Sequence, residues 1–362
     1  MEINLKKIFH NAHSLVTQLK RKGISVTGVT KACLGSPEIA NTWLLAGVRE
    51  IGDSRIENII TLSSIKNIAS MLLIRTPMLS QVDEIVAHAT VSLNSELRVI
   101  RELSRSAQKA NRIHKVILMI ELGDLREGLM PSALEQTIRS VLKLPNILFI
   151  GIGANLACRS GVIPDSKNMS ELSKIADSID AIFGPIVKIV SGGNSANLEW
   201  ALAKSNSMGR INNLRLGESL LLGCNPLDRK ALKGLHSDAI NLVAEVIELQ
   251  TKPSQPSGNI GQSAFGGVTN HNHKVGTTRQ AILAIGRQDI DPDGITPPAG
   301  IQILAASSDH LILDISDSSE PIEVGSEIAF TLNYSALLCA MTSPFVAQRF
   351  SYPSELDTPK AQ

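Results

Sequence analysis

Eight short apolar runs mark the N-terminal part of the sequence, and each ends in polar residues or glycine. They are Ser25 to Lys31, Glu50 to Arg55, Met71 to Arg75, Val91 to Glu96, Lys115 to Gly123, Ile147 to Asn155, Ile186 to Asn194 and Asn212 to Gly217. Stretches of helical period, such as Pro37 to Ala46 and Asn94 to Ala110, lie between them. Strands that alternate with helices favour βα units around a parallel sheet. Eight such units predict a closed (β/α)8 TIM barrel.

The residues that close these runs are candidates for an active site. In a barrel of this kind, the carboxyl ends of the strands form the active-site face. We therefore expect one mouth to be lined by Lys31, Asp53, Arg75, Asn94, Asn155, Asn194 and Arg215. Lys31 is the most informative of these, because a lysine at a strand end is either a salt-bridge partner or a reactive amine.

The pattern changes after Gly223, where Cys224 to Lys230 brings turn-forming and charged residues. Short alternating segments follow, at Ala239 to Leu249, Gln280 to Gly286, Gly300 to Ala306, His310 to Ile315 and Glu327 to Leu332. Short strands separated by Gly, Pro and Asp turns predict an antiparallel β domain with little helix. The expected domains are thus a barrel over residues 1–228 and a C-terminal β domain over 229–362.

Composition excludes several classes of partner. The net charge is +1 and 19% of residues are charged, without a dense basic cluster, which argues against nucleic acid and anionic membranes. The segment Met1 to Lys7 lacks the apolar core of a signal peptide, and no run reaches the roughly 18 apolar residues of a membrane span. The four cysteines are scattered with no CxxC pair, which suits a reducing compartment and gives no zinc signature. We expect a cytoplasmic protein with no metal.

A lysine in a dry pocket can form an imine with an aldehyde, and pyridoxal phosphate (PLP) is the obvious aldehyde. Its phosphate would need a site, and phosphate sites in such barrels favour the loops after strands seven and eight. There the sequence offers Ser191 to Ser195, with two glycines and two serines, and Arg215 to Ser219. Backbone N–H groups and serine hydroxyls bind anions without a formal positive charge. Taken alone, Ser191 to Ser195 could equally be a flexible turn.

Seven segments resemble the alanine racemase family, in order and across nearly the whole chain. They are Met1 to Asn11, the lysine motif Val29 to Ala32, the arginine loop Leu122 to Gly128, the strand end Leu214 to Gly217, Ala284 to Asp289, Ser307 to His310 and Leu332 to Tyr334. Gly52 to Asn58, Leu93 to Leu97 and Gly286 to Asp289 are most similar to the ornithine racemase branch of this family of fold-type III PLP enzymes.

The resemblance implies that Lys31 binds PLP through an imine and is one catalytic base, and that Arg215 faces the pyridine nitrogen. A guanidinium does not give up its proton, so that nitrogen would stay unprotonated, which favours proton exchange over transamination. Arg126 and Asp309 align with substrate-side positions, with Asp309 supplied by the partner subunit of a homodimer. The implied cofactor-binding residues are Lys31, Asn155, Asn194, Ser195, Arg215, Gly217, Glu218 and Tyr334.

Three positions depart from the family. No tyrosine follows the lysine in Ala32 to Gly35, Asn155 takes the place of a ring-stacking histidine, and Gly261 to Gly266 lacks the tyrosine base of the opposite face. A two-base racemase needs a proton donor on each side of the α-carbon. The candidates are Asp309, His310, His271, His273, Cys33 and Cys158. Each also has a structural interpretation, such as a turn cap for Asp309 or a solvated turn for His271 to His273.

The leading interpretation is a PLP-dependent racemase of a free amino acid, with a basic one such as ornithine favoured by the branch. Asp124, Glu127 and Asp309 could then recognise a cationic side chain, or pair with arginines instead. The alternatives are an alanine or broad-specificity racemase, a non-catalytic PLP homeostasis protein, whose barrel lacks a second domain, and an aldolase or dehydratase of the same fold. The last would require a metal, for instance at His310 and Cys339.

Overall fold

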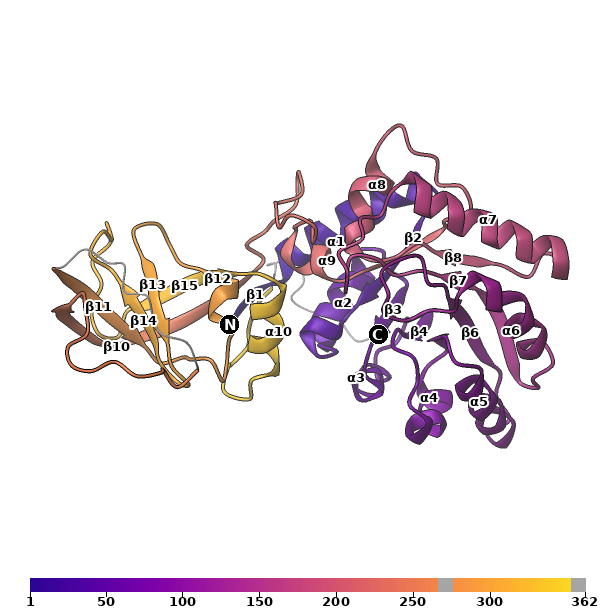
Figure 1. Ribbon diagram of the computed structural model, residues 1–362, viewed down its shortest axis with the longest axis horizontal. Coiled ribbons are helices and arrows are strands. Elements are labelled where there is room, and N and C mark those ends of the chain that lie inside the picture. Colours follow the sequence, from indigo (N-terminus) through magenta and orange to yellow (C-terminus); the bar gives the residue numbers. More distant parts are fainter. Residues whose placement is uncertain (266–275, 353–362) are drawn as a thin grey trace, which may run out of the picture. The chain divides into compact units, whose positions relative to one another are not determined.

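The computed structural model describes residues 1–265 and 276–352, which form two compact units (Figure 1). Leu5–Ser237 make up the barrel unit. The β unit joins Met1–Asn4 to the chain from Asp238 onward. The domain boundary expected at residue 228 lies within the last segment of the barrel unit. His271 and His273 lie outside the described residues.

Eight parallel strands close a barrel, which confirms the predicted fold class (Figure 1). Each predicted run contains one strand, and the last pairs with the first to complete the circle. The strands are β2 (Ser25–Val29), β3 (Glu50–Asp53), β4 (Ser70–Leu73), β5 (Val91–Asn94), β6 (His114–Met119), β7 (Ile147–Gly153), β8 (Ile189–Ser191) and β9 (Asn213–Leu216).

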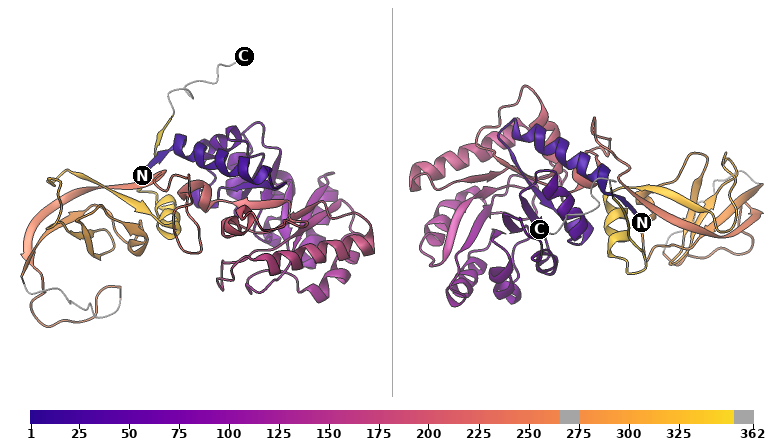
Figure 2. Two further views of the ribbon diagram at one scale, coloured as in Figure 1. Left: turned by 90° about the horizontal axis from the view of Figure 1, so that it is seen from above. Right: turned by 180° about the vertical axis from the view of Figure 1, so that it is seen from behind.

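Helices surround the strands, as Figure 2 shows from two further sides. They are α1 (Leu5–Lys20), α2 (Pro37–Leu45), α3 (Ile56–Leu62), α4 (Val82–His88), α5 (Leu97–Lys109), α6 (Leu134–Val141), α7 (Ser166–Phe183), α8 (Leu198–Leu202) and α9 (Glu218–Leu222). Local sequence sets their starts. Ser36 accepts a hydrogen bond from the Ile39 amide ahead of Pro37, and Asp165 accepts from the amides of Lys167 and Asn168.

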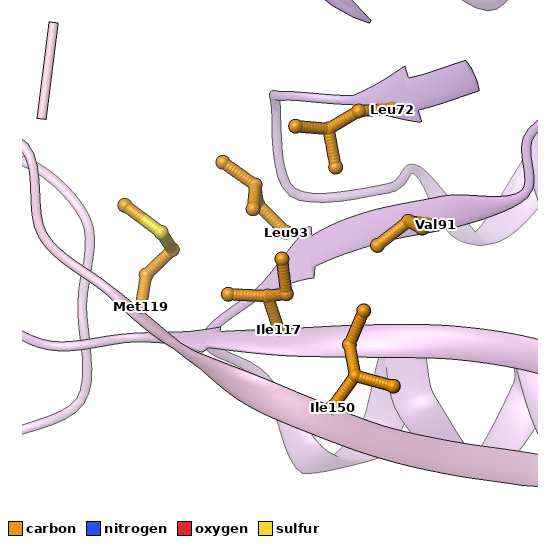
Figure 3. Close-up of a cluster of buried hydrophobic side chains, with 6 residues drawn as sticks. All are labelled: Leu72, Val91, Leu93, Ile117, Met119 and Ile150. Carbon is orange, nitrogen blue, oxygen red and sulfur yellow. The ribbon is translucent and has the colours of Figure 1, made fainter. Parts of the chain in front are cut away.

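The barrel interior is apolar on one side and polar on the other. The apolar side is a buried cluster from β4 to β7, made of Leu72, Val91, Leu93, Ile117, Met119 and Ile150 (Figure 3). Burying an aliphatic side chain of this size stabilises the fold by about 1.5–3 kcal/mol. The strands β8, β9, β2 and β3 instead carry Ser191, Asn213, Arg215, Thr27 and Glu50, which hydrogen bond to one another.

The alternation along β2 fixes which side chains face the interior. A Cβ atom added at Gly28 would lie 2.8 Å from the ring of Trp43 in α2, so position 28 faces outward. Because successive side chains of a strand point to opposite faces, Thr27 and Val29 face inward. Lys31 follows at the mouth with the same parity.

The β unit is an eight-stranded sheet in which β12, β15, β10, β11, β14 and β13 are antiparallel neighbours. The predicted antiparallel β domain is therefore confirmed. Its strands are β1 (Glu2–Asn4), β10 (Ile240–Pro253), β11 (Thr277–Leu283), β12 (Ile295–Thr296), β13 (Gln302–Ala306), β14 (Leu311–Asp314), β15 (Glu327–Leu332) and β16 (Arg349–Ser351). β1 pairs with β10 and with β16, so both ends of the described chain belong to this sheet.

The β unit also contains one helix that the sequence pattern did not predict, α10 (Tyr334–Thr342). Asn333 caps it by accepting a hydrogen bond of 3.0 Å from the Ala336 amide. Across the described ranges, no helix has the length and apolar character needed to cross a membrane.

Candidate active site

Lys31 begins the short helical turn η1 (Lys31–Cys33) directly after β2 and is half-buried. The turn ends at Leu34, which adopts a left-handed conformation with φ of 50°. This places the lysine at the carboxyl end of the barrel, where the sequence predicts it.

Asp53 holds this turn from outside the barrel. It is fully buried, and it accepts hydrogen bonds from the Thr30 hydroxyl at 2.7 Å, the Arg55 amide at 2.9 Å and Asn58 Nδ2 at 3.0 Å. Burial raises the pKa of the Asp53 carboxyl, and these hydrogen bonds oppose the rise. The prediction that Asp53 lines the mouth is wrong, because it alternates with the inward-facing Gly52.

Asn94 was also predicted to line the barrel mouth, but its side chain faces away from the barrel interior. Its Nδ2 donates to the carbonyl and to the hydroxyl of Ser92, each at 2.9 Å, on the face of β5 opposite Leu93. The residue is fully buried. Asn94 therefore supports the strand end from behind and does not line the mouth.

Cys33 is also poorly suited to be the second base. The residue is buried, and its thiol donates to the Thr30 carbonyl at 3.2 Å. Burial and the nearby charge of Asp53 raise the pKa of the Cys33 thiol far above its ordinary value. A thiol that keeps its proton so firmly is a poor second base.

Arg215 lies on β9, where it is only 5% exposed. Its Nη1 donates to the Ser191 hydroxyl at 2.6 Å and its Nη2 to the Ala154 carbonyl at 2.7 Å. No carboxylate of the described residues hydrogen bonds to it. Burial lowers the pKa of Arg215 to about 10, so the guanidinium is still a cation near neutral pH. Arg215 therefore presents a fixed positive donor inside the barrel.

The loops after β8 and β9 meet, as a phosphate site would require. The hydroxyls of Ser195 and Ser219 are 3.0 Å apart, and the Ser219 amide donates to the Ser195 hydroxyl at 3.2 Å. Both serines are buried. Gly217 lets β9 approach β2, because a Cβ atom there would lie 2.9 Å from the Val29 carbonyl oxygen.

Glu218 follows Gly217, and its carboxylate is already engaged. Oε1 accepts a hydrogen bond from Arg229 Nη1 and from the Cys224 thiol at 3.9 Å. Burial raises the pKa of the Glu218 carboxyl, while the positive charges of Arg229 and Lys31 oppose the rise. An anionic side chain repels phosphate. If Glu218 contacts the phosphate as predicted, the contact would have to come from its backbone and not from its carboxylate. Nothing in the sequence pattern indicated Arg229.

Asn194 orients Asn155 through its side chain. Its Nδ2 donates to Asn155 Oδ1 at 3.1 Å and to the Leu156 carbonyl at 2.9 Å, and its Oδ1 accepts from the Ala196 amide at 2.8 Å. The Nδ2 of Asn155 is buried and finds no hydrogen-bond partner in the described part of the chain. Such a group costs about 1–3 kcal/mol when left unsatisfied, which points to an acceptor supplied by a bound molecule.

Arg126 lies in the loop after β6 and pairs with Glu127, with Nη2 at 2.6 Å from Oε1. This hydrogen bond raises the pKa of Arg126 above its usual range. The charge of Glu127 raises the pKa of Arg215 and the charge of Arg126 lowers it, so this loop lies close enough to act on the barrel mouth. Cys158 itself is exposed, and Asn194 Nδ2 lies 3.5 Å from its sulfur.

Asp124 fastens the Arg126 loop to the loop that carries Cys158. Its carboxylate accepts hydrogen bonds from the amides of Cys158, Arg159 and Ser160 at 3.2, 3.0 and 3.1 Å. The residue is 1% exposed. Asp124 is thus occupied by backbone donors and is not available to recognise a cationic substrate.

Three predicted residues belong to the β unit. Asp309 Oδ1 accepts from His310 Nδ1 at 2.9 Å and from the Ser308 hydroxyl at 3.1 Å. The hydrogen bond from His310 is the main reason that the pKa of Asp309 lies below its ordinary value. Both side chains are exposed. Tyr334 is the first residue of α10.

Residues 3–226 match the family described as alanine racemase, N-terminal domain. The ornithine racemase of Acetoanaerobium sticklandii is 38% identical over 346 residues, which cover 95% of this chain and 97% of that protein. The lysine racemase of Thermotoga maritima is 36% identical over 345 residues, which cover 95% of this chain and 96% of that protein.

Solved structures give a likeness of fold. The alanine racemase of the D-cycloserine producer Streptomyces lavendulae has a TM-score of 0.73 at 16% identity, with 98% of this chain and 97% of that one covered. An alanine racemase of Clostridium difficile 630 has a TM-score of 0.72 at 19% identity, with 97% and 94% covered. The barrel and the antiparallel β unit therefore occur together in known proteins.

Proposed function

This chain belongs to the alanine racemase family and is an amino-acid racemase, and we propose that it interconverts the L and D forms of a free basic amino acid with PLP as cofactor. The observation that carries the proposal is the pair of cations at the barrel mouth. Lys31 follows β2, and Arg215, on the neighbouring strand β9, hydrogen bonds only to neutral groups among the described residues.

The residues at the mouth suit PLP. The buried, unpartnered Nδ2 of Asn155 needs an acceptor, which a pyridine ring substituent or phosphate provides. The Ser195 hydroxyl and the backbone at Gly217 and Glu218 would hold the phosphate, and the family resemblance adds the hydroxyl of Tyr334. Lys31 would hold the aldehyde carbon. When bound, the cofactor supplies the electron sink that acidifies the α-hydrogen of an amino acid.

Proton movement then falls to side chains of this protein. Lys31 Nζ would take the α-proton from one face of the substrate and return it in the reverse direction. Arg215 is protonated at neutral pH, so it would donate a hydrogen bond to the ring nitrogen and would not transfer a proton. The opposite face needs a second donor, and the remaining candidates in the described residues are Cys158, Asp309 and His310.

Recognition of the substrate would use both signs of charge. The Arg126 guanidinium suits an α-carboxylate, because a planar fork of donors matches two carboxylate oxygens. A distal ammonium needs a carboxylate, and Asp124 is already occupied by three backbone amides. Glu127 is also occupied, because its carboxylate accepts from Arg126. We propose Asp309 for that role, contributed by the second subunit of a homodimer.

A panel of single L-amino acids tests the substrate class. Ornithine, lysine, arginine and alanine would each be incubated with the protein and PLP, and the D form would be measured by chiral chromatography. We expect ornithine or lysine to be converted at least tenfold faster than alanine. Equal conversion of all four would indicate a broad-specificity racemase, and conversion of none would support a non-catalytic PLP-binding protein.

A further inference from the structure

We propose that Glu50 is a positioning residue for Arg215, acting through hydrogen bonds inside the barrel that pass by way of Ser191, Asn213 and Thr27. The inference rests on the proposed function, because it assigns a purpose to the orientation of Arg215. It concerns four strands of the barrel unit and no residue of the β unit.

The chain of contacts is continuous. Arg215 Nη1 donates to the Ser191 hydroxyl at 2.6 Å, and that hydroxyl donates to Asn213 Oδ1 at 2.6 Å. Asn213 Nδ2 then donates to the Thr27 hydroxyl at 3.0 Å, which donates to Glu50 Oε2 at 3.1 Å. Four hydrogen bonds thus join a cation to an anion.

The strand register produces this chain. Ser191 is level with Asn213 across β8 and β9, Thr27 is level with Arg215 across β9 and β2, and Thr27 is level with Glu50 across β2 and β3. Thr27 and Arg215 share the inward face of their strands. A slip of one residue in any pairing would turn one of these side chains outward.

The two ends fix the direction of every bond between them. A guanidinium only donates and a carboxylate only accepts. Ser191, Asn213 and Thr27 must therefore each accept from the arginine side and donate toward Glu50. Reversing any one group would leave two donors or two acceptors facing each other.

Burial makes the remote carboxylate important. Ser191, Asn213, Thr27 and Arg215 are each at most 5% exposed. A buried cation is costly unless negative charges compensate it, and burial lowers the pKa of Arg215 while the charge of Glu127 opposes the fall. Glu50 is the first residue of β3 and is half-buried, so its carboxylate keeps some contact with water. The polarised chain lets its charge stabilise the guanidinium in one orientation.

A branch leads from the same amide to Ser25 but ends without charge. Asn213 Nδ2 lies 3.1 Å from the Ser25 hydroxyl, which donates to the Asn212 carbonyl. This branch helps to hold the Asn213 amide. Only the branch through Thr27 reaches a carboxylate.

The test interrupts the series of hydrogen bonds at Thr27, three hydrogen bonds away from Arg215. Thr27→Val keeps the shape of the side chain and removes the hydroxyl, whereas Thr27→Ser keeps the hydroxyl. Glu50→Gln keeps an acceptor and removes the charge. Thr42→Val is the matched control, because Thr42 is 3% exposed and its hydroxyl donates only to the Glu38 carbonyl in α2.

The first readout is NMR of the full-length protein with ¹⁵N-labelled arginine, in which the Nη signals of Arg215 are assigned by their loss in Arg215→Lys. We expect two resolved Nη signals in the wild type, Thr27→Ser and Thr42→Val, because both nitrogens are held. Thr27→Val and Glu50→Gln should shift or merge them. Unchanged signals in Thr27→Val and Glu50→Gln would overturn the inference.

The second readout is the ratio of transamination to racemisation with PLP bound. Thr27→Val should raise this ratio by about threefold to tenfold, the scale of one lost hydrogen bond, and Thr27→Ser should restore it. Equal effects of Thr27→Val and Thr27→Ser, with none from Glu50→Gln, would show a packing role and contradict the proposal. If the wild-type protein neither bound PLP nor racemised an amino acid, the proposed function would be refuted. The NMR comparison would still decide whether Glu50 orients Arg215.

Discussion

Arg229 donates a hydrogen bond to the carboxylate of Glu218 and thereby holds a negative charge beside Lys31. The Glu218 side chain is 11% exposed and that of Arg229 is 54% exposed, so the arginine covers the carboxylate from the solvent side. The turn that carries Arg229 is closed by hydrogen bonds from the Asn225 amide to the Lys230 carbonyl and from the Leu232 amide to the Gly223 carbonyl.

This ion pair should control the reactivity of the Lys31 amine. Glu218→Gln removes the negative charge that attracts the Lys31 side chain, so the amine should be held less tightly and acetic anhydride should label Lys31 about threefold to tenfold faster at pH 8. Arg229→Ala leaves Lys31 as the main cation near Glu218, so labelling should slow. Peptide mass spectrometry of the cofactor-free protein measures both rates.

The control for that comparison is Glu135→Gln. Glu135 pairs with Arg139 on the surface, where both side chains are more than half exposed, so Lys31 should be labelled as in the wild type. If Glu218→Gln and Arg229→Ala changed labelling in the same direction, the pair would act by covering the lysine and not by charge.

Borohydride should fix PLP to Lys31. Reduction of an imine joins the cofactor permanently to the amine that formed it, so one modified peptide containing Lys31 is expected after digestion. Lys31→Ala should lose both this product and the visible colour of the protein, whereas Lys174→Ala should keep both. A modified peptide from another lysine would show that Lys31 is not the attachment site.

Arg215 should set the reaction specificity. Glutamate at this position would supply a partner that protonates the pyridine nitrogen and strengthens the electron sink, so Arg215→Glu should divert turnover toward pyridoxamine phosphate. Absorbance spectra and product analysis during turnover measure the diversion. Unchanged spectra with unchanged racemisation would exclude Arg215 as the partner of that nitrogen.

The second proton donor should be found by comparing two cysteines. Cys158→Ala removes an exposed thiol at the mouth, and Cys33→Ala removes a buried one that donates to a carbonyl. If Cys158 is the donor, its loss should slow one direction of exchange at least tenfold, and Cys33→Ala should not. If neither cysteine variant slows exchange, His310→Ala is the next variant to test. If His310→Ala also leaves both directions of exchange unchanged, the second proton would have to come from water.

Complementation should detect shared active sites. Lys31→Ala and Asp309→Ala proteins should each be inactive, and mixing them after gentle dissociation should restore about a quarter of the wild-type activity, as random pairing of subunits in a two-fold dimer gives. Fully active wild-type protein that sediments as a monomer would rule out sharing.

The barrel could be predicted from sequence because fully buried parallel strands produce apolar runs that end abruptly. Lys31 and Arg215 were found in the same way, as polar residues at run ends. The orientation of a strand's last side chain was harder to predict. Asp53 and Asn94 end their strands but face outward, since their inward-facing neighbours are Gly52 and Leu93.

Other features depend on contacts between distant residues. β1 has three residues, too few for a periodic pattern, and its partners lie beyond residue 239. The chain from Arg215 to Glu50 requires the register of Ser25 with Asn213, which no local motif encodes. Arg229 meets Glu218 only because the turn after Gly223 folds back.

The most direct test of the proposed racemase activity is exchange of the α-hydrogen in D₂O, followed by proton NMR with L-ornithine and L-lysine as substrates. We expect that the α-proton signal disappears, that optical rotation falls to zero at equilibrium, and that Lys31→Ala shows neither change. Retention of the α-proton and of optical rotation by the PLP-loaded wild type, with both substrates, would contradict it.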